Sequence, residues 1–321
     1  MRAIVIAQPG GPEVLRLGQA PDPSLADGDV LVRVAAAGVN RADLLQRRGH
    51  YPAPPGVPQD IPGLEYAGTI ESAPAGSQWR RGDRVMGLVG GGAYAEFVAT
   101  PADQVLPVPE GWSFADAAAV PEAYLTAFDA LVLQAGLGPG ERALIHAIGS
   151  GVGVAALGIA KAQGAEVAGT SRTKSKLERA RTLGLDHAVL VSGAFMPDAA
   201  LTNWANVIAE LVGGPYLAGD LAAVAPRGRI VVIGLTGGRE APLNLGTVLS
   251  KRVTIIGTVL RTRDALEKTL LVKRFREVGL PWLVAGTIRP VLSKAFPMAD
   301  AAEAHRYLEA NSNFGSVVLS W

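Results

Sequence analysis

The hydrophobic pattern divides the chain into a β-like first third and a middle part in which strands and helices alternate. Up to about residue 100, short apolar or alternating runs are bounded by Gly, Pro and Asp, a pattern that predicts strands. We expect these strands at Ala3–Ala7, Val30–Ala36, Tyr66–Ser72, Arg84–Gly87 and Tyr94–Thr100.

Two segments in the first part of the chain do not follow the strand pattern. The stretch Pro52–Pro62 is rich in proline, which predicts an irregular surface loop. The segment from Ser113 to Ala135 is helix-like, and Ser113 stands where a serine would cap the first turn.

From residue 142 onward, buried strands alternate with amphipathic helices. The predicted strands are Ala143–Ala147, Glu166–Thr170, Ala188–Val191, Asn206–Leu211, Arg229–Gly234 and Val253–Val259. The predicted helices are Gly151–Gln163, Lys174–Leu183, Tyr216–Val224 and Thr262–Glu277. This alternation indicates a parallel sheet joined by right-handed crossovers.

The tail returns to the strand pattern, and this return predicts the domain organisation. We expect a strand at Ile288–Leu292, a helix at Asp300–Ala310 and a strand at Gly315–Leu319. The prediction is therefore an α/β protein in which a β-rich domain of residues 1–120 is rejoined by residues 282–321. The nucleotide-binding domain, residues 121–281, is inserted between them.

The composition fits a folded enzyme. Hydrophobic residues make up 49% and charged residues 18% of 321 residues, and single cores rarely grow beyond about 250–300 residues, so two domains are expected. The net charge of +1 gives no electrostatic case for nucleic acid or an anionic membrane. The apolar run that ends at Pro9 is too short for an export signal, so we expect a cytoplasmic protein.

A glycine-rich turn follows the strand Ala143–Ala147. Its residues are Gly149, Ser150, Gly151, Val152 and Gly153, and a helix begins within it. Glycines let the backbone approach a pyrophosphate, and the helix N-terminus offers free N–H groups. No Lys follows, which excludes a P-loop. The alternative is a tight turn in a buried sheet, without a ligand.

The end of the next strand predicts which dinucleotide binds. NAD-specific sites place an acidic residue about 20 residues beyond the glycine loop, where it binds the adenine ribose. Here no carboxylate occurs before Glu178, and Ser171, Arg172 and Lys176 stand in that region instead. These residues suit a 2′-phosphate, so we expect NADPH. The alternative is a solvated basic cluster.

Several segments together resemble a known family. They are Ala37–Tyr51, Pro62–Gly68, His146–Gly153, Gly228–Gly238 and Ala304–Leu319. Over essentially its whole length the chain resembles the zinc-free quinone oxidoreductases of the medium-chain dehydrogenase/reductase superfamily, closest to the p53-inducible quinone-oxidoreductase-like branch. The resemblance implies a GroES-like catalytic domain and a Rossmann domain with a doubly wound parallel sheet.

The resemblance does not extend to the zinc ligands of the superfamily's alcohol dehydrogenases. Those enzymes carry a Cys near the position of Asn40 and a His in a Gly-His-Glu motif, which here reads Gly63-Leu64-Glu65. The chain has no cysteine, and its histidines lack ligand spacing; they are His50, His146, His187 and His305. We therefore expect no metal.

The family motifs also imply site residues. Asn40, Asp43 and Tyr51 are the candidates for the catalytic site, Asp43 as a residue that orients its neighbours. Asn40 and Asp43 equally fit a helix N-cap, and Tyr51 could pack on the Pro-rich loop. Further candidates for cofactor contact are Thr126, Leu235, Leu260, Arg261, Asn313 and Phe314. Ordinary turn, loop or helix packing is the alternative for each of these six.

The expected function is an NADPH-dependent quinone oxidoreductase that passes reducing equivalents to a small-molecule acceptor. A conjugated enone, alkenal or enoyl-thioester reductase is the alternative of the same class, and a cofactor-binding protein with little turnover is the alternative of a different class. The apolar, β-branched strand Val253–Val259 predicts a sheet edge that pairs in a homodimer. We expect neither membrane nor nucleic-acid binding.

Overall fold

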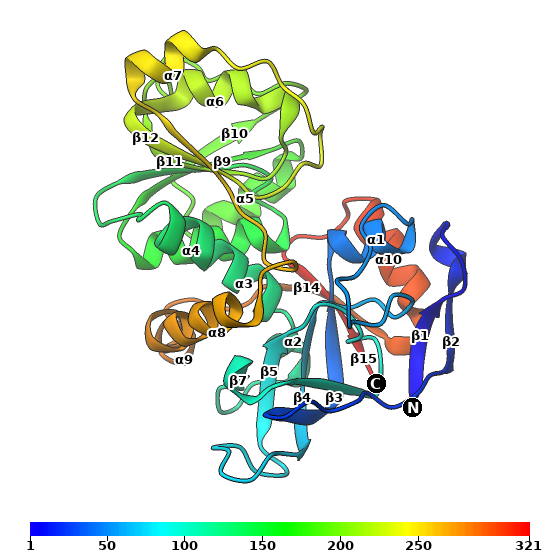
Figure 1. Cartoon of the computed structure of the whole chain (residues 1–321). Coiled ribbons are helices and arrows are strands. Elements are labelled where there is room, and N and C mark those ends of the chain that lie inside the picture. Colours follow the sequence, from blue (N-terminus) through cyan, green and yellow to red (C-terminus); the bar gives the residue numbers. More distant parts are fainter. The chain divides into compact units, whose positions relative to one another are not determined.

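Contacts divide the chain into two units, each formed by more than one segment (Figure 1). In the computed structural model, which describes residues 1–321, unit 1 contains Met1–Leu125, Leu260–Val284 and Pro290–Trp321. Unit 2 contains Thr126–Val259 and Ala285–Arg289. Residues 260–281, predicted in the nucleotide-binding domain, thus group with unit 1. One contact of this segment within unit 1 is the hydrogen bond from the Gln104 side chain to the carbonyl oxygen of Ala265 (3.0 Å).

Unit 2 is built on a parallel sheet. Its strands are β8 (Arg142–Ile145), β9 (Glu166–Ser171), β10 (His187–Leu190), β11 (Ala205–Glu210), β12 (Val224–Val232) and β13 (Thr254–Gly257). Their order is β10-β9-β8-β11-β12-β13, and every pairing is parallel. This is the doubly wound order predicted from the sequence. The chain builds the sheet outward in one direction from β8 to β10 and in the other from β11 to β13, so the switch point lies between β8 and β11.

Helices cover the sheet of unit 2. They are α4 (Gly151–Ala162), α5 (Lys174–Thr182), α6 (Leu217–Ala223) and α7 (Leu245–Lys251), with a π-helix at Asp129–Gln134 and a 3₁₀ turn at Gly214–Tyr216. Because both faces are covered, β8 and β11 are almost entirely buried and apolar. The longest helix, α4, begins at the glycine-rich turn, where the Ser150 hydroxyl accepts a hydrogen bond from the Gly153 N–H (3.0 Å).

The connection from β10 to β11, residues 191–204, contains no helix. It covers the sheet instead with Phe195, which is 0% exposed and meets the ring of His146 edge-on at 4.9 Å. Gly219 in α6 makes this possible, because a Cβ there would lie 2.1 Å from the carbonyl oxygen of Phe195. An extended segment against a glycine therefore replaces the helix that this crossover would otherwise need.

Unit 1 is the β-rich part. Its strands are β1 (Arg2–Ile6), β2 (Leu15–Gln19), β3 (Asp29–Val39), β4 (Glu65–Ser72), β5 (Arg84–Leu88), β6 (Phe97–Pro101), β7 (Val105–Pro107), β14 (Leu292–Pro297) and β15 (Ser316–Ser320). The main sheet has the order β14-β15-β3-β4-β5-β7, β6 also pairs with β3, and β1 and β2 form a separate ribbon. The long strand β3 carries most of this pairing, and its alternating Val side chains enter the core.

The remaining helices lie wholly or partly in unit 1. They are α1 (Arg41–Arg47), α2 (Phe114–Ala118), α3 (Pro121–Phe128), α8 (Ala265–Arg274), α9 (Leu280–Val284) and α10 (Ala301–Glu309). Short 3₁₀ turns occur at Pro12–Val14, Ala102–Gln104 and Met298–Asp300, and a π-helix at Phe275–Gly279. Residues 52–62 form no helix or strand, as predicted.

Proline explains two boundaries that differ from the prediction. The segment Ser113–Ala135 is not one helix, because α2 ends before Pro121, whose missing N–H suits the first turn of α3. The strand predicted at Ile288–Leu292 begins only at Leu292, after Pro290, which cannot donate to a ladder. Strands β2 and β7 and helices α1, α7 and α9 were not predicted.

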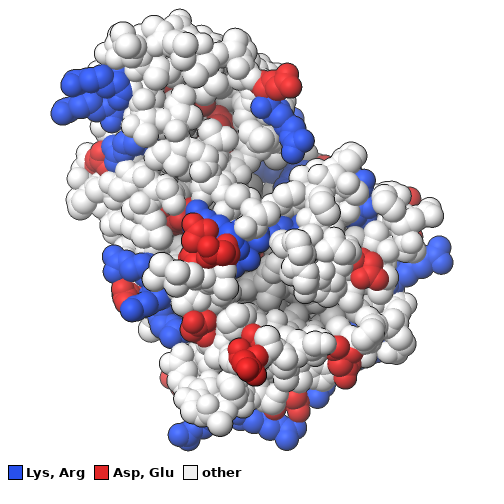
Figure 2. Space-filling view, in the orientation of Figure 1, with Lys and Arg blue, Asp and Glu red and all other residues white.

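The surface is mixed in charge. On the face in Figure 2, acidic and basic side chains are interspersed, with broad uncharged areas between them. No broad field of one sign is visible from this side. None of the helices combines the length and the apolar character that crossing a bilayer requires.

Candidate active site

In unit 1, polar side chains converge where β3 runs into α1. Asn40 is the N-cap of α1, and its N–H donates to Oδ2 of Asp43 (2.7 Å). Oδ1 of the fully buried Asp43 accepts from the Gly63 N–H (2.9 Å), and Tyr94 donates its hydroxyl to Oδ2 (3.3 Å). Burial raises the pKa of Asp43 to about 6 despite these donors. Asp43 therefore fixes backbone, while Asn40 keeps a half-buried amide.

Glu65, from β4, meets the amide of Asn40. Its Oε1 accepts from Nδ2 of Asn40 (2.7 Å) and its Oε2 from the N–H of Glu122 (2.8 Å). The side chain crosses β3 at Gly38, where a Cβ would lie 2.0 Å from Oε1. Burial raises the pKa of Glu65 to about 8, which outweighs the two donors. Burial therefore favours the neutral form of this carboxyl group up to a higher pH than in an exposed glutamate.

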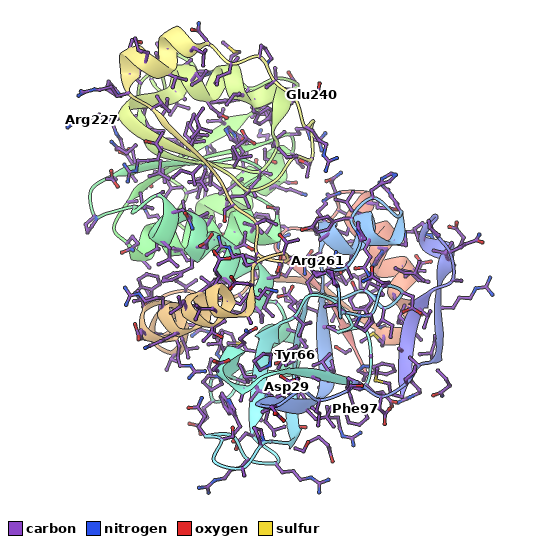
Figure 3. All side chains as sticks on the ribbon, viewed as in Figure 1. Asp29, Tyr66, Phe97, Arg227, Glu240 and Arg261 are labelled. Carbon is purple, nitrogen blue, oxygen red and sulfur yellow. The ribbon has the colours of Figure 1, made fainter.

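A second acid and a cation lie beside Tyr51. Glu122 is half-buried in the first turn of α3, and burial and the charge of Asp43 raise its pKa to about 7, although Arg261 opposes the shift. Arg261, labelled in Figure 3, lies over the Tyr51 ring at 4.9 Å and donates to the Tyr51 carbonyl oxygen (3.0 Å). It also donates to the Gly90 carbonyl oxygen (2.7 Å), so it clamps two loops of unit 1.

Behind Asp43, a buried chain of polar contacts leads to the surface of unit 1. The Tyr94 hydroxyl lies 3.4 Å from Nε2 of His305, and Nδ1 of His305 lies 3.2 Å from Nη1 of Arg47. Arg47 is 1% exposed and pairs with Glu309. Burial and the charge of Arg47 lower the pKa of His305 to about 3, so this histidine stays neutral.

In unit 2, the glycine-rich turn has the close packing that a phosphate loop requires. A Cβ on Gly153 would lie 2.5 Å from the carbonyl oxygen of Ala147, which keeps α4 tight against the end of β8. A Cβ on Gly149 would lie 2.7 Å from Cδ of Lys176. The aliphatic part of Lys176 therefore packs on the loop. The helix α4 begins at Gly151, so the N–H groups of Gly151 and Val152 belong to its first turn.

The other residues expected at the 2′-phosphate lie at the end of β9. Ser171 is 8% exposed, and its hydroxyl accepts from the Thr173 N–H (3.1 Å). Arg172 is exposed, and its charge lowers the pKa of Tyr216, which burial raises. Lys176 and Arg172 therefore flank the glycine loop and Tyr216, while Ser171 shapes the turn between them.

The remaining candidates for cofactor contact differ in exposure. Thr126 is 8% exposed, and its Oγ1 is buried without a hydrogen-bond partner, whereas Leu235, beyond the end of β12, is 44% exposed. Four others are buried in unit 1: Leu260, Arg261, Asn313 and Phe314. The Asn313 amide donates to the Gly315 carbonyl oxygen (2.8 Å), the ordinary turn contact considered as its alternative.

A further buried cluster lies at the switch point of unit 2. His146 follows β8, and its Nε2 lies 2.7 Å from Oδ1 of Asp220 in α6 and 3.7 Å from Oε2 of Glu210, the last residue of β11. We call His146, Glu210 and Asp220 the switch-point triad. Their atoms are the chain's only group of three or more His or acidic side chains close enough to hold one metal ion.

Comparison with known proteins agrees with this geometry. Residues 26–110 match the family described as alcohol dehydrogenase GroES-like domain, and residues 151–274 match the zinc-binding dehydrogenase family. A rat quinone oxidoreductase (Rattus norvegicus) is 32% identical over 99% of this chain and 97% of its own length. The chain belongs to the quinone oxidoreductase family of the medium-chain dehydrogenase/reductase superfamily. The predicted α/β fold with GroES-like and Rossmann units is thereby confirmed.

Solved structures of this superfamily match the whole chain. A mycobacterial protein in complex with NADPH has a TM-score of 0.85 at 27% identity, with 100% of both chains covered. An NAD-dependent alcohol dehydrogenase has a TM-score of 0.85 at 30% identity, with 100% of both chains covered. The CurK enoyl reductase has a TM-score of 0.82 at 27% identity and covers 99% of this chain and 98% of its own.

The zinc implied by one family description does not fit the residues of unit 1. The position expected for a cysteine is Asn40, and Leu64, 1% exposed, stands in the histidine position of the motif. The oxygens of Glu65 are occupied by Asn40 and Glu122. An amide and one engaged carboxyl group lack the imidazole and thiolate donors that catalytic zinc takes.

Sequence reasoning missed Glu65 as a site residue, together with Glu122 and the switch-point triad. Glu65 and Glu122 are distant in sequence from Asn40, and no short motif joins them. Glu210 did carry a signal, because an acid at the end of a buried apolar strand is costly unless it has partners.

Glu65 generates a prediction about stability. The pKa of Glu65 is about 8 in the folded protein and 4.5 in the unfolded chain. The stability that its proton contributes is therefore complete below pH 4.5 and is lost as the pH rises through 8. Glu65→Gln, neutral at every pH, should flatten the fall in unfolding free energy between about pH 5 and 8 by up to about 1.4 kcal/mol per pH unit. Urea melts across this range measure the difference from wild type, and parallel pH profiles would show that Glu65 is ionised in the folded protein.

Proposed function

We propose that this chain is an NADPH-dependent quinone oxidoreductase that works without zinc. The observation that carries the proposal is the glycine-rich turn between β8 and α4, at the point where the sheet order reverses. Open α/β sheets bind their ligands at this point, and a Cβ on Gly149 or Gly153 would clash with Lys176 or with the Ala147 carbonyl oxygen. The first turn of α4 would offer the N–H groups of Gly151 and Val152 to a pyrophosphate.

The other proposed cofactor contacts follow from this placement. Gly149, Ser150, Gly151, Val152 and Gly153 would hold the pyrophosphate. The Thr126 hydroxyl, buried without a partner, fits a ligand that completes its hydrogen bonding. Leu235 would pack against the cofactor, and four buried residues are further proposed contacts: Leu260, Arg261, Asn313 and Phe314.

The acceptor would be oriented by Asn40 and Tyr51. Nδ2 of Asn40 donates one hydrogen to Oε1 of Glu65 (2.7 Å), and its second hydrogen would be free for a bound acceptor. Nδ2 and the Tyr51 hydroxyl would both donate to an acceptor carbonyl. The pKa of Glu122 is raised to about 7, and the charge of this carboxyl group acts on Tyr51, whose pKa it raises. Bound NADPH supplies the electrons, and a quinone delocalises the incoming charge without a Lewis acid.

A second candidate function is reduction of a conjugated enone or enoyl thioester. The observation in its favour is the whole-chain likeness to an enoyl reductase. The same two donors, Asn40 and Tyr51, would polarise an enone carbonyl.

Turnover of a quinone panel against an enone panel tests the function. We expect NADPH oxidation with quinones to exceed that with enones, and a chelator to leave the rate unchanged because no zinc takes part. Faster enone turnover would favour the second candidate. Tight NADPH binding with no turnover on either panel would instead make the chain a binding protein.

Cofactor preference follows from the end of β9. A planar guanidinium at Arg172 and the ammonium of Lys176 would pair with the 2′-phosphate, and each charge-assisted hydrogen bond contributes about 1.5–3 kcal/mol. We expect kcat/KM for NADPH to exceed that for NADH by about a hundredfold, and Arg172→Glu to reduce the ratio at least about tenfold.

Lys174→Glu is the matched control for Arg172→Glu. Lys174 lies two residues away, is 81% exposed and faces Glu178 at 4.0 Å. This change should leave the cofactor ratio near the wild-type value. Equal kcat/KM for the two cofactors in the wild-type protein would refute the preference.

We also propose a homodimer formed through β13. This strand pairs only with β12, and Ile255 is 38% exposed on it. Light scattering at micromolar concentration should give a dimer mass, and Ile255→Lys should give a monomer. Leu190→Lys, on the opposite edge strand β10, is the control that should stay dimeric. A monomer mass for the wild-type protein would rule the proposal out.

A further inference from the structure

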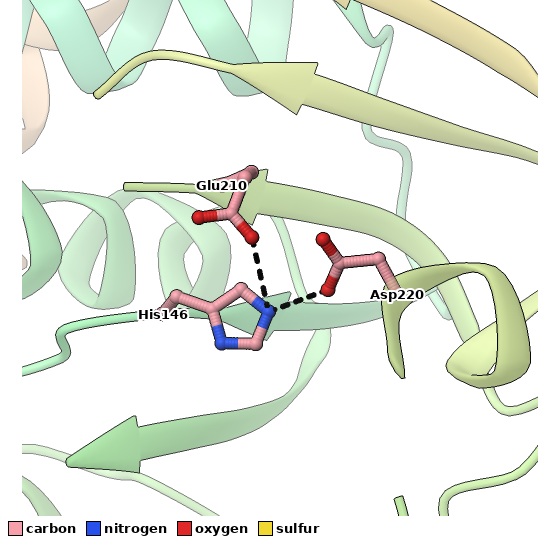
Figure 4. A group of neighbouring side chains, drawn as sticks. All are labelled: His146, Glu210 and Asp220. Carbon is pink, nitrogen blue, oxygen red and sulfur yellow. Dashed lines mark hydrogen bonds and ion pairs between the residues drawn. The ribbon is translucent and has the colours of Figure 1, made fainter. Parts of the chain in front are cut away.

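The switch-point triad is a dry, closely bonded group (Figure 4). His146 and Asp220 are 0% exposed and Glu210 is 1% exposed. On the far side of the imidazole, Nδ1 of His146 lies 2.9 Å from the Thr170 hydroxyl of β9. The rings of Phe195 and Tyr216 close the cluster edge-on, at 4.9 and 4.8 Å from the His146 ring.

The triad contains two acids and no compensating cation. Burial lowers the pKa of His146 to about 4, so the imidazole is neutral. Burial raises the pKa of Glu210 to about 8 and that of Asp220 to about 7. The other titratable or charged groups facing the triad are Tyr216, from the turn before α6, and Arg172, whose charge acts on Tyr216. Two carboxylates in such a place would repel each other without a positive partner.

Two carboxyl oxygens of the triad have no hydrogen-bond partner. Oε2 of Glu210 and Oδ2 of Asp220 are buried and accept no hydrogen bond. The other oxygen of each carboxyl group does accept hydrogen bonds: Oε1 of Glu210 accepts from backbone N–H groups, and Oδ1 of Asp220 accepts from His146. A proton shared between Oε2 and Oδ2 would satisfy both.

A metal ion fits this geometry less well than a proton. Two ligand atoms that each lie about 2.0–2.2 Å from one metal ion are separated by about 3 Å or more. Nε2 of His146 and Oδ1 of Asp220 are 2.7 Å apart, which is the length of a direct hydrogen bond. The imidazole therefore donates to Asp220, and no space for an ion remains between these two atoms.

The triad ties together the strand ends from which the cofactor loops arise. The N–H of His146 donates to the Ala209 carbonyl oxygen (3.1 Å), and the N–H of Ile148 donates to the Thr170 carbonyl oxygen (3.0 Å). Oε1 of Glu210 accepts from the N–H groups of Val212 and of Gly213 (2.7 Å). Gly213 has a φ of +86°, and the loop after β12 contacts it through a bridge to Gly238.

We propose that His146, Glu210 and Asp220 are positioning residues of the cofactor site and share one proton, whose loss weakens cofactor binding and leaves the reaction step unchanged. This inference rests on the proposed function. Losing the proton places a second negative charge below loops that bind an anionic cofactor. The two carboxylates then repel each other, and this repulsion strains the N–H contacts of Val212 and Gly213.

The dissociation constant of NADPH measured against pH tests the proposal. Cofactor fluorescence should show wild-type binding weakening roughly five- to tenfold or more between about pH 7 and 9.5, a typical size for coupling between sites. Asp220→Asn and Glu210→Gln should bind with a flat pH profile, since each keeps a neutral amide donor opposite one remaining acid. With saturating NADPH, kcat should stay within about twofold of wild type in both variants.

Glu166→Gln is the matched control. Glu166 also pairs with a histidine, His187, at 2.6 Å, but it begins β9 rather than ending a strand at the loops. This variant should keep the wild-type pH profile. Unfolding of the cofactor-free proteins provides a second readout, because the shared proton should make wild-type stability fall with pH more steeply than that of Asp220→Asn.

Several outcomes would overturn the inference. A pH-independent dissociation constant for the wild-type protein would do so even if both variants fail to fold. The same pH profile in wild type and both variants would place the titrating group elsewhere. One divalent ion per chain, lost in Asp220→Asn, would replace the shared proton with a metal. No NADPH binding at any pH would instead refute the proposed function itself.

Discussion

A carboxyl group buried inside the protein must either find donors or keep its proton, and the candidate sites of both units depend on this constraint. In unit 1, Asp43 finds three donors and fixes the start of α1 and the Gly63 turn. Glu65 has only two donors, and its burial leaves the neutral form favoured. In unit 2, Glu210 and Asp220 have no basic partner, and the neutral His146 lies between them and β8. Each group holds segments that are far apart in the sequence.

The same constraint explains why the functional loops are so well defined. The carboxyl end of a parallel strand leaves backbone groups without ladder partners, and side chains must satisfy them. Glu210 does this for Val212 and Gly213, while Thr170 joins β9 to the loop after β8. In unit 1, Arg261 plays a similar role, since its guanidinium joins the loops at Tyr51 and Gly90. Loops held in this way can present backbone N–H groups to a ligand at little entropic cost.

The hydrophobic periodicity and the positions of Gly and Pro were enough to predict much of the fold. The alternation after residue 142 predicted all six strands of the parallel sheet, because buried parallel strands read as apolar runs between glycines. Short elements such as β7 and α1 were missed, since three to seven residues carry too little periodicity. Pro121 and Pro290 shifted element boundaries through their missing N–H groups.

The candidate site was predicted only in part. Asn40 and Tyr51 lie in one motif, whereas Glu65 and Glu122 come close to Asn40 and Tyr51 only through the fold. The pairing of His146 with Asp220 could not be read from either residue alone.

The central claim is that the buried carboxyl groups of Glu65 and of the switch-point triad carry protons near neutral pH. Infrared difference spectroscopy measures this directly, because a protonated carboxyl group absorbs apart from a carboxylate and shifts on deuteration. Between about pH 6 and 9.5, wild-type protein should lose protonated-carboxyl bands as groups with raised pKa values titrate. One such band should be absent from Glu65→Gln and another from Glu210→Gln. A spectrum with only carboxylate bands at neutral pH, in all three proteins, would contradict the account.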